Sequence, residues 1–430
     1  MMMRRIFGLI WINVMLYVMM LCVVSAAMGS GGDGVGDGVG DGDNDMFYLI
    51  GRRAAEIAMR ELPFERGDKN TLLMTTASYA VIDGRTTERS VDGVSDASGC
   101  TIGNGNLLII HKMSCPLWFA FFKKDTKDCV YIEVNSEAIA GVDRIENMSD
   151  DRIFKIVREN IGHVLEKPEV WNNKINSKVF GGNEFSIITI STVWERGVPY
   201  DLLQAGKFHN HFCPGLLSGY MIVKFVEKKL PLSEGECYQV IAVPPWCKDD
   251  AVQIMTDATV GHKQMAVKTL TEKQRKHLKD NNVAGIFIRW NKKEKCGDAA
   301  VVSFNWDKVY EIAGVNRSDF RSFDTYKWWW ARLKTNLALL EHLENNEFVS
   351  IVREFRIESA DELDHLKSAG VNPLEELGLT NKAMTKAHSA HVVSTSLAII
   401  VAAFIFLKKA CQNVNGKFKT KRRPNRTKRR

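Results

Sequence analysis

The segment KFHNHFCPGLLSGYMI carries the side chains best suited to chemistry. His209 and His211 alternate as in an extended stretch, so both rings can lie on one side of the chain. Cys213 directly precedes Pro214, and proline is favoured in the first turn of a helix. The sulfur would then lie at a helix N-terminus, where free N–H groups and the helix dipole favour a thiolate. Because Zn²⁺ and Fe²⁺ accept imidazole and thiolate ligands, the spacing predicts a soft-metal site.

A polar cluster beside a disulfide is the alternative interpretation of the same residues. Cys247, which precedes Asp250 and Ala251, bears on the choice. It is a candidate fourth ligand, a redox partner of Cys213, or the disulfide partner of Cys237. Three protein ligands would leave one coordination position open, as in catalytic zinc sites, whereas four would close the site.

Two helices of related sequence are expected to position these residues. The first covers residues 45–62, with Asp45 as its N-cap and Pro63 at its end, and the second runs from Pro214 to just before Pro231. Copy one contains GRRAAEIAMRELPFERGD and copy two, 168 residues later, GYMIVKFVEKKLPLSEGE. Further landmarks recur in the same order, which predicts an internal repeat of a helix–strand–helix–strand module.

The segments around the second copy complete the expected elements. Residues 185–192 (FSIITIST) are predicted to form a buried strand, and residues 198–207 a short helix leading into the motif. Residues 324–344 form a helical pattern with three consecutive tryptophans, for which core packing is favoured over a membrane-interface anchor or a ligand platform. Short helices are expected to follow in residues 347–366 and 372–377.

The motif residues resemble the FmdE family, whose name comes from proteins associated with formylmethanofuran dehydrogenase and whose members occur mainly in methanogens and other anaerobes. The family pattern is His-Gly-His-x-Cys-Pro-Gly, then Cys-x-x-Asp-Ala-x-Gln, then Gly-Cys-Thr-x-Gly-Lys-Gly-Asn. Copy two matches the first two parts, with Asn210 in place of the first glycine; the matching residues are His209, His211, Cys213, Pro214, Gly215, Cys247, Asp250, Ala251 and Gln253. Of the third part, it keeps Thr259, Gly261 and Lys263.

Copy one shows the reverse distribution of the motifs. It keeps the third part, as Gly99, Cys100, Thr101, Gly103, Gly105 and Asn106. It lacks the His-x-His-x-Cys string, and Asp41, Asp43 and Asp45 stand at those spacings, where a linker with a helix cap is favoured over a Ca²⁺ site. The two copies could build one composite site that includes Cys100, or copy one could be a degenerate structural repeat with Cys100 buried.

The resemblance implies an α+β fold with antiparallel sheets, similar to the catalytic domain of glyceraldehyde-phosphate dehydrogenases. It implies a metal, Zn²⁺ above all, at four residues: His209, His211, Cys213 and Cys247. It further implies that four others contact a cofactor: Cys100, Asp250, Gln253 and Thr259. Fe²⁺ and a metallated tetrapyrrole are the alternatives to zinc. The dehydrogenase activity itself is not transferred, because no molybdopterin or formyl-transfer motif is present.

The ends of the chain predict a single-pass membrane protein. Arg4, Arg5 and an apolar run indicate a signal peptide, and a second apolar run precedes a tail with eleven Lys and Arg from Lys408 onward. The positive-inside rule then places the tail in the cytoplasm and the body outside it. The expected order is a signal (1–27), a Gly/Asp-rich linker (28–45), two FmdE-like modules (46–165 and 166–320), a helical part (321–386), a transmembrane helix (387–409) and a basic tail (410–430).

Charge argues against nucleic acid as a partner. The net charge is +7, and without the eleven cations of the tail it falls to −4. Two functional classes remain. The first is a surface protein that binds a metal or small metallocofactor. Its partner would be a second copy of the chain, in a homodimer, or a transporter. The second is a metal-dependent or thiol redox enzyme, or an accessory protein linked to formylmethanofuran dehydrogenase.

Overall fold

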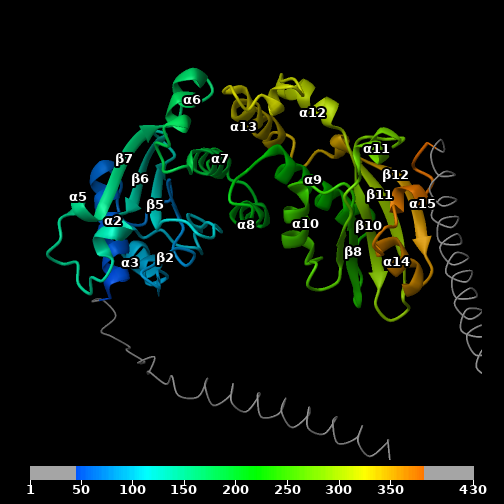
Figure 1. Ribbon diagram of the computed structural model, residues 1–430, viewed down its shortest axis with the longest axis horizontal. Coiled ribbons are helices and arrows are strands. Elements are labelled where there is room, and N and C mark those ends of the chain that lie inside the picture. Colours follow the sequence, from blue (N-terminus) through cyan, green and yellow to red (C-terminus); the bar gives the residue numbers. More distant parts are fainter. Residues whose placement is uncertain (1–44, 382–430) are drawn as a thin grey trace, which may run out of the picture. The chain divides into compact units, whose positions relative to one another are not determined.

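The computed structural model describes residues 45–381 (Figure 1), which form two compact units. Unit 1 contains residues 45–163 and 177–187, and unit 2 contains residues 164–176 and 188–381. The expected signal, most of the linker, the transmembrane segment and the basic tail lie outside the described residues. Within residues 45–381, no helix combines the length and apolar character needed to cross a membrane.

Unit 1 is a five-stranded sheet with two main helices. Its helices are α2 (Met46–Glu61), α3 (Arg89–Ser98), α4 (Ser136–Ile139) and α5 (Asp150–Ile153). Its sheet strands are β1 (Thr71–Thr75), β4 (Leu107–Ile109), β5 (Trp118–Lys123), β6 (Asp128–Val134) and β7 (Phe154–Asn160). A separate hairpin pairs β2 (Val81–Ile82) with β3 (Arg85–Thr86). The sheet order is β4-β1-β5-β6-β7, and only the β1–β4 pair is parallel.

Unit 2 has a second five-stranded sheet and more helices. Its helices include α6 (Pro168–Asn176), α8 (Tyr200–Phe208), α9 (Pro214–Lys229), α10 (Lys248–Thr256), α11 (Glu272–Lys276), α12 (Trp306–Ala313), α13 (Lys327–Leu340), α14 (Ala360–Lys367) and α15 (Pro373–Glu376). Two 3₁₀ turns are η1 (Asp319–Arg321) and η2 (Asn346–Phe348). Its strands are β8 (Glu236–Ala242), β9 (Met265–Val267), β10 (Val283–Asn291), β11 (Cys296–Phe304) and β12 (Val349–Ile357). Helix α7 (Glu184–Trp194) begins in unit 1 and ends in unit 2.

The two sheets have the same topology. The second is ordered β12-β11-β10-β8-β9, with β8–β9 as its parallel pair, so β8 corresponds to β1 and β12 to β7. Each of these sheets is therefore mixed and mostly antiparallel. Helices α9 and α10 follow the same path as α2 and α3. The repeat expected from the sequence is confirmed, and the α+β class with it.

Each sheet buries a layer of apolar side chains under its helices. In unit 1, side chains of α2, among them Ile50 and Ala54, share a core with Leu73, Phe119 and Val130 of the sheet. In unit 2, helices α9 and α10 lie over one face of the sheet and α14 and α15 over the other (Figure 1). The site-bearing ends of α9 and α10 are thus anchored to a sheet by buried apolar contacts.

Matched glycines let the two helices of each unit approach closely. A Cβ on Gly51 would lie 2.0 Å from the carbonyl oxygen of Ser90, and one on Gly219 would lie 2.5 Å from that of Lys248. These distances are shorter than real Cβ contacts, and backbone atoms on the facing helix cannot move aside alone. The glycine recurs because it fixes the same helix crossing in both copies.

Gly51→Ala is expected to lower the free energy of unfolding of unit 1 by about 1–3 kcal/mol, as overpacking does. This loss would occur although alanine is favoured over glycine inside a helix by roughly 1 kcal/mol. Chemical denaturation measures it. Gly103→Ala is the matched control, since no atom lies within 4 Å of the added methyl there. Equal effects of both changes would contradict the close helix contact.

Two expectations about secondary structure are wrong. Residues 185–192 lie in helix α7 rather than in a strand, and β12 occupies the first half of a segment expected to be helical. Helix α7 begins after a turn in which the Glu184 carboxylate accepts hydrogen bonds from the backbone N–H groups of Phe180 and Gly182. Core packing of the tryptophans holds for Trp329, which is buried and donates its indole N–H to Asn172 at 3.3 Å.

Candidate metal centre

Three of the four predicted metal ligands meet at the ends of three helices in unit 2. His209 ends α8, Cys213 is the N-cap of α9, and Cys247 is the N-cap of α10. One donor atom from each lies within 4.8 Å of the other two. The Nε2 atom of His209 is 3.6 Å from the Sγ atom of Cys213. Donor atoms around a tetrahedral zinc ion lie roughly 3.3–3.8 Å apart, given its bond lengths, so the group is close to the required spacing.

Both sulfurs lie where a helix begins. The helix dipole and the unpaired N–H groups of the first turn favour negative charge at such positions. Gly215 lets the two helix starts come together, since a Cβ there would lie 3.0 Å from the Cβ of Cys247. The Cys-Pro-Gly string thus has a local reason for each residue: a ligand at the N-cap, a proline in the first turn, and no side chain facing Cys247.

Asp250 orients the histidine. Its carboxylate lies 2.6 Å from Nδ1 of His209, and this leaves Nε2 directed at the thiols. Metal-binding histidines commonly donate their second ring N–H to a carboxylate, which fixes the tautomer and makes the ligand more basic. Asp250 was expected to contact a cofactor; in the structure, its carboxylate pairs with His209, a member of the candidate metal group.

The protonation states of His209, Cys213 and Cys247 depend on one another. Burial alone would lower the pKa of His209, but hydrogen bonds with Asp250 and Cys247 outweigh it and raise the pKa to about 9. The hydrogen bond between the two thiols raises the pKa of Cys213 and lowers that of Cys247. Without a metal, the neutral-pH state is therefore an imidazolium at His209, a thiol at Cys213 and a thiolate at Cys247.

His211 lies beside the group but not in it. Its ring centroid is 4.3 Å from that of His209, and its Nδ1 atom is 3.1 Å from the side-chain oxygen of Asn210. Burial and the nearby charge of His209 lower its pKa to about 4, so the ring is neutral. Asn210 has φ +58°, a left-handed conformation that glycine adopts freely and that asparagine tolerates. Glycine, which the resembling pattern has at this position, would adopt the same conformation without strain.

Asp250→Asn is expected to weaken metal binding about 10- to 100-fold, because the amide cannot make His209 as basic a ligand. Competition with a chromophoric chelator measures the change. Asp257→Asn, which alters an exposed carboxylate beyond the end of α10, is the control and should leave affinity unchanged. A similar effect of the two substitutions on metal affinity would show that Asp250 has no specific part in metal binding.

The other predicted cofactor contacts lie outside the group. Gln253 lies on α10, half-buried. The hydroxyl of Thr259 accepts a hydrogen bond from the N–H of His262, three residues on, as that of Thr101 does from Asn104 in copy one. Threonine at this position therefore closes a turn in both units.

Cys100 belongs to the core of unit 1. It is fully buried, its sulfur lies 3.8 Å from the carbonyl oxygen of Thr71, and burial raises its pKa to about 11. The thiol is thus protonated and packed among apolar side chains. None of the seven cysteines in residues 45–381 forms a disulfide, which excludes a Cys237–Cys247 bond in this structure.

Copy one carries ionic side chains where copy two has thiols. Asp45, at the position of Cys213, caps α2 by accepting hydrogen bonds from the N–H groups of Phe47 and Tyr48. Arg89, at the position of Cys247, forms an ion pair with Asp92, which matches Asp250. The same helix ends are therefore capped and paired within the unit, and the metal donor set is confined to copy two.

Sequence reasoning missed a buried ion pair beside Cys247. The amine of Lys248 is fully buried, lies 2.6 Å from the Asp249 carboxylate and stacks over the ring of Trp246 at 4.1 Å. The second carboxylate oxygen of Asp249 accepts the N–H of Trp246 at 2.9 Å. The pair fixes the turn that presents Cys247, and removal of one partner would leave a buried charge uncompensated.

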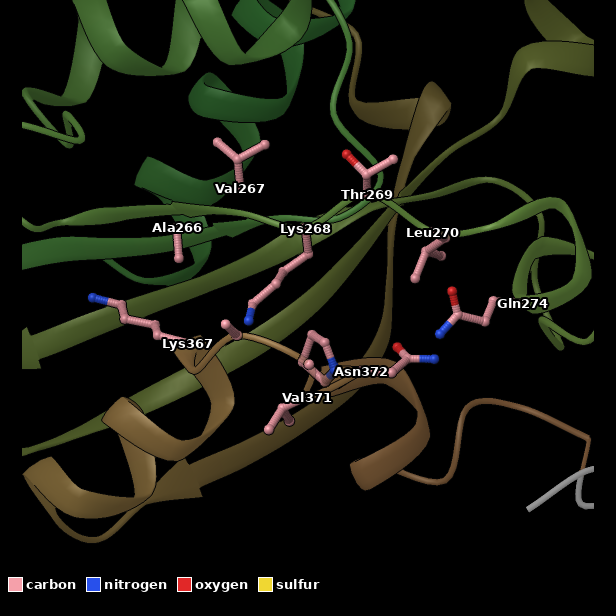
Figure 2. A pocket seen from close by; sticks show the side chains of 12 residues that line it. Ala266, Val267, Lys268, Thr269, Leu270, Gln274, Lys367, Val371 and Asn372 are labelled. Atoms are coloured by element: carbon pink, nitrogen blue, oxygen red, sulfur yellow. The ribbon is translucent and has the colours of Figure 1, made fainter. Parts of the chain in front are cut away.

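A separate surface pocket of about 420 Å³ lies beside the edge strand β9 (Figure 2). Residues 266–274 and 367–373 contribute its lining, none of which belongs to the metal group. The amines of its two lysines already bond to the chain: Lys268 to the carbonyl of Ser368, and Lys367 to that of Lys263. The pocket is therefore distinct from the candidate metal centre.

Comparison with known proteins identifies both units. A family model described as "FmdE, Molybdenum formylmethanofuran dehydrogenase operon" matches residues 46–170 and residues 208–312. The second match contains all three donors of the candidate metal centre. None of the curated proteins compared matches the chain.

Proposed function

Because the chain belongs to the FmdE family, as two tandem copies of its domain, we propose that it is a metal-binding protein whose second copy holds one zinc-type ion. The ligands are His209, Cys213 and Cys247. The observation that carries this is the convergence of one imidazole nitrogen and two sulfurs within 4.8 Å, with Asp250 fixing the imidazole. Such a donor set suits Zn²⁺ or Fe²⁺ and does not suit Mg²⁺ or Ca²⁺, which take oxygen ligands.

The protein residues prepare the site for the ion. Asp250 keeps the proton of His209 on Nδ1, so that Nε2 faces the sulfurs. The helix starts at Cys213 and Cys247 stabilise the thiolates that the ion requires. Bound zinc would supply a Lewis acid with one coordination position available to an external ligand. The alternative to a zinc-type ion at this site is a metallated tetrapyrrole with a His or Cys as its axial ligand.

We further propose that the protein is anchored in the cell membrane with the metal-binding units outside the cytoplasm. The support is the sequence pattern at the two ends: an apolar run after Arg4 and Arg5, and a second apolar run before the basic tail. Protease added to intact cells is expected to degrade the two units and spare an epitope placed after Arg430. Protection of the two units would contradict this topology.

A cobalt titration tests the metal site. When Co²⁺ is added to the purified full chain, thiolate-to-cobalt charge-transfer absorption should appear in the near ultraviolet and reach a plateau at one equivalent. His209→Ala should weaken the signal, and His342→Ala, a change at a histidine paired with Glu347, should not. The absence of a thiolate–cobalt band in the wild-type protein would end the proposal.

Thiol redox chemistry is the second candidate, favoured by the contact between two reduced cysteines. Cys213 and Cys247 are unpaired, and their donor atoms lie within 4.8 Å. Their oxidation by a disulfide-bearing partner would form the Cys213–Cys247 bond and transfer two electrons and two protons to the partner as two thiols. Zinc protects such thiols from alkylation, whereas a redox pair without metal reacts readily, so thiol alkylation before and after chelation separates the two candidates.

A further inference from the structure

The metal centre has a neighbour that lies outside both family-matched segments. Helix α13 belongs to a long connection, residues 305–348, between β11 and β12. The corresponding connection of unit 1, between β6 and β7, contains the two four-residue helices α4 and α5. The family match in the second copy ends at residue 312, so α13 lies outside the matched segments, and it has no counterpart in the β6–β7 connection of unit 1.

Helix α13 is fastened to the metal-binding loop. The amide of Asn336, fully buried, donates a hydrogen bond of 3.0 Å to the carbonyl oxygen of Phe212, the residue before Cys213. The helix also packs against α9, which begins at the metal centre. Arg332 lies one turn before Asn336 and thus on the same face of α13.

The guanidinium of Arg332 is held in place by its own unit. Its Nη1 atom donates to the carbonyl oxygens of Trp328 at 2.6 Å and Phe320 at 3.1 Å. The rings of Phe320, Phe323 and Trp328 surround it at 5.4–5.8 Å from their centroids. A side chain fixed by backbone carbonyls and aromatic rings has already lost much of its rotamer freedom, which favours binding by a preorganised group.

One edge of this guanidinium is available. Among the described residues, Nε and Nη2 of Arg332 have no hydrogen-bond partner, and Arg332 forms no ion pair with a carboxylate. The Nε and Nη2 N–H groups point the same way and match the two oxygens of a carboxylate. A half-buried guanidinium without a carboxylate partner among residues 45–381 favours a carboxylate from outside.

The electrostatics place this charge close to the metal ligands. The cation acts on the pKa of His211, and the charges of Cys213 and Cys247 act in turn on the pKa of Arg332. Zinc with two thiolates and one neutral imidazole has no net charge, so the anion left at the centre is the Asp250 carboxylate, which is already paired with His209.

We propose that Arg332 anchors the carboxylate of a small external ligand that approaches the open position of the metal. This rests on the proposed metal site. The substrate or cargo of this protein is thus a carboxylate-bearing molecule, and the inserted helix α13 supplies its recognition. A protein of the same family without α13 would lack this preference.

The test uses the purified full chain loaded with Co²⁺ and titrated with acetate, with chloride and inorganic phosphate as comparison anions. Acetate should perturb the visible cobalt spectrum at lower concentration than either. Arg332→Gln should raise the acetate dissociation constant of the Co²⁺-loaded protein at least tenfold. Arg332→Lys should be intermediate, because it keeps the charge and loses the two-pronged contact.

Lys334→Gln is the matched control, since it removes a charge from the same helix at an amine that bonds to the carbonyl of Gly314. Equal acetate affinity in the wild type, Arg332→Gln and Lys334→Gln would overturn the inference and leave the metal site intact. Stronger binding of phosphate than of acetate would also overturn it. Failure of Co²⁺ to bind the wild type would overturn the metal site, and this inference with it.

Discussion

Replacing Cys213 or Cys247 by serine is expected to lower Zn²⁺ affinity by about 100- to 1000-fold in each case. Structural zinc binding is worth roughly 10–16 kcal/mol, shared among a few ligands, and a neutral hydroxyl is a poor substitute for a thiolate. At about 1.4 kcal/mol per tenfold change, the loss of one thiolate accounts for two to three orders of magnitude. Chelator competition measures the affinities.

Cys296→Ser is the matched control for these two variants. Cys296 begins β11 and its sulfur contacts a guanidinium nitrogen of Arg356 at 3.0 Å, so it lies outside the donor group. Its substitution should change Zn²⁺ affinity by less than threefold. A loss at Cys296 equal to that at Cys213 would mean that zinc binds to exposed thiols at large rather than to a defined centre.

Metal affinity is expected to rise steeply with pH, by about 100-fold per unit near neutrality. In the metal-free protein, His209, whose pKa is raised to about 9, and Cys213, whose pKa is raised further, both hold a proton at pH 7. Both protons must leave when the ion binds, and each released proton adds about a factor of ten per pH unit. Calorimetry in two buffers of different ionisation enthalpy should report close to two protons released.

The proton on His209 also stabilises the metal-free fold, so the stability of that fold changes with pH in the direction opposite to metal affinity. A His209 pKa above its unfolded value stabilises the fold fully below pH about 6.5, and this contribution is lost as pH rises through about 9. His209→Ala should therefore reduce the number of protons released on metal binding by one. It should also weaken the pH dependence of metal affinity and that of the stability of the metal-free protein. Unchanged proton release in that variant would show that His209 is not a ligand.

The repeat and the candidate metal centre could be predicted because their signals are local. Asp45 and Pro63 bound α2, and Cys213-Pro214 starts α9, as capping chemistry requires. Two of the three donors lie within five residues, and the third precedes a recognisable helix start. His211 was included because alternation along the chain is visible in sequence, whereas the left-handed backbone conformation of Asn210, between the two histidines, is not.

The errors have physical causes that differ. An eight-residue apolar run such as residues 185–192 fits a buried strand or a buried helix equally well, and only its neighbours decide. The strand β12 did carry a partial signal, since Val349 and Ile351 are separated by a polar residue, and so are Phe355 and Ile357, while Val352 and Arg353 interrupt the alternation. The role proposed for Arg332 had no local signal, because this residue lies more than a hundred residues downstream of Cys213.

The most direct test of the central claim is the metal content of the purified full chain. After exhaustive dialysis, elemental analysis should find one zinc or iron ion per wild-type chain, none in Cys213→Ser/Cys247→Ser, and close to one in His211→Ala. A wild-type chain that retains no metal, even after reconstitution with Zn²⁺ under reducing conditions, would contradict the assignment.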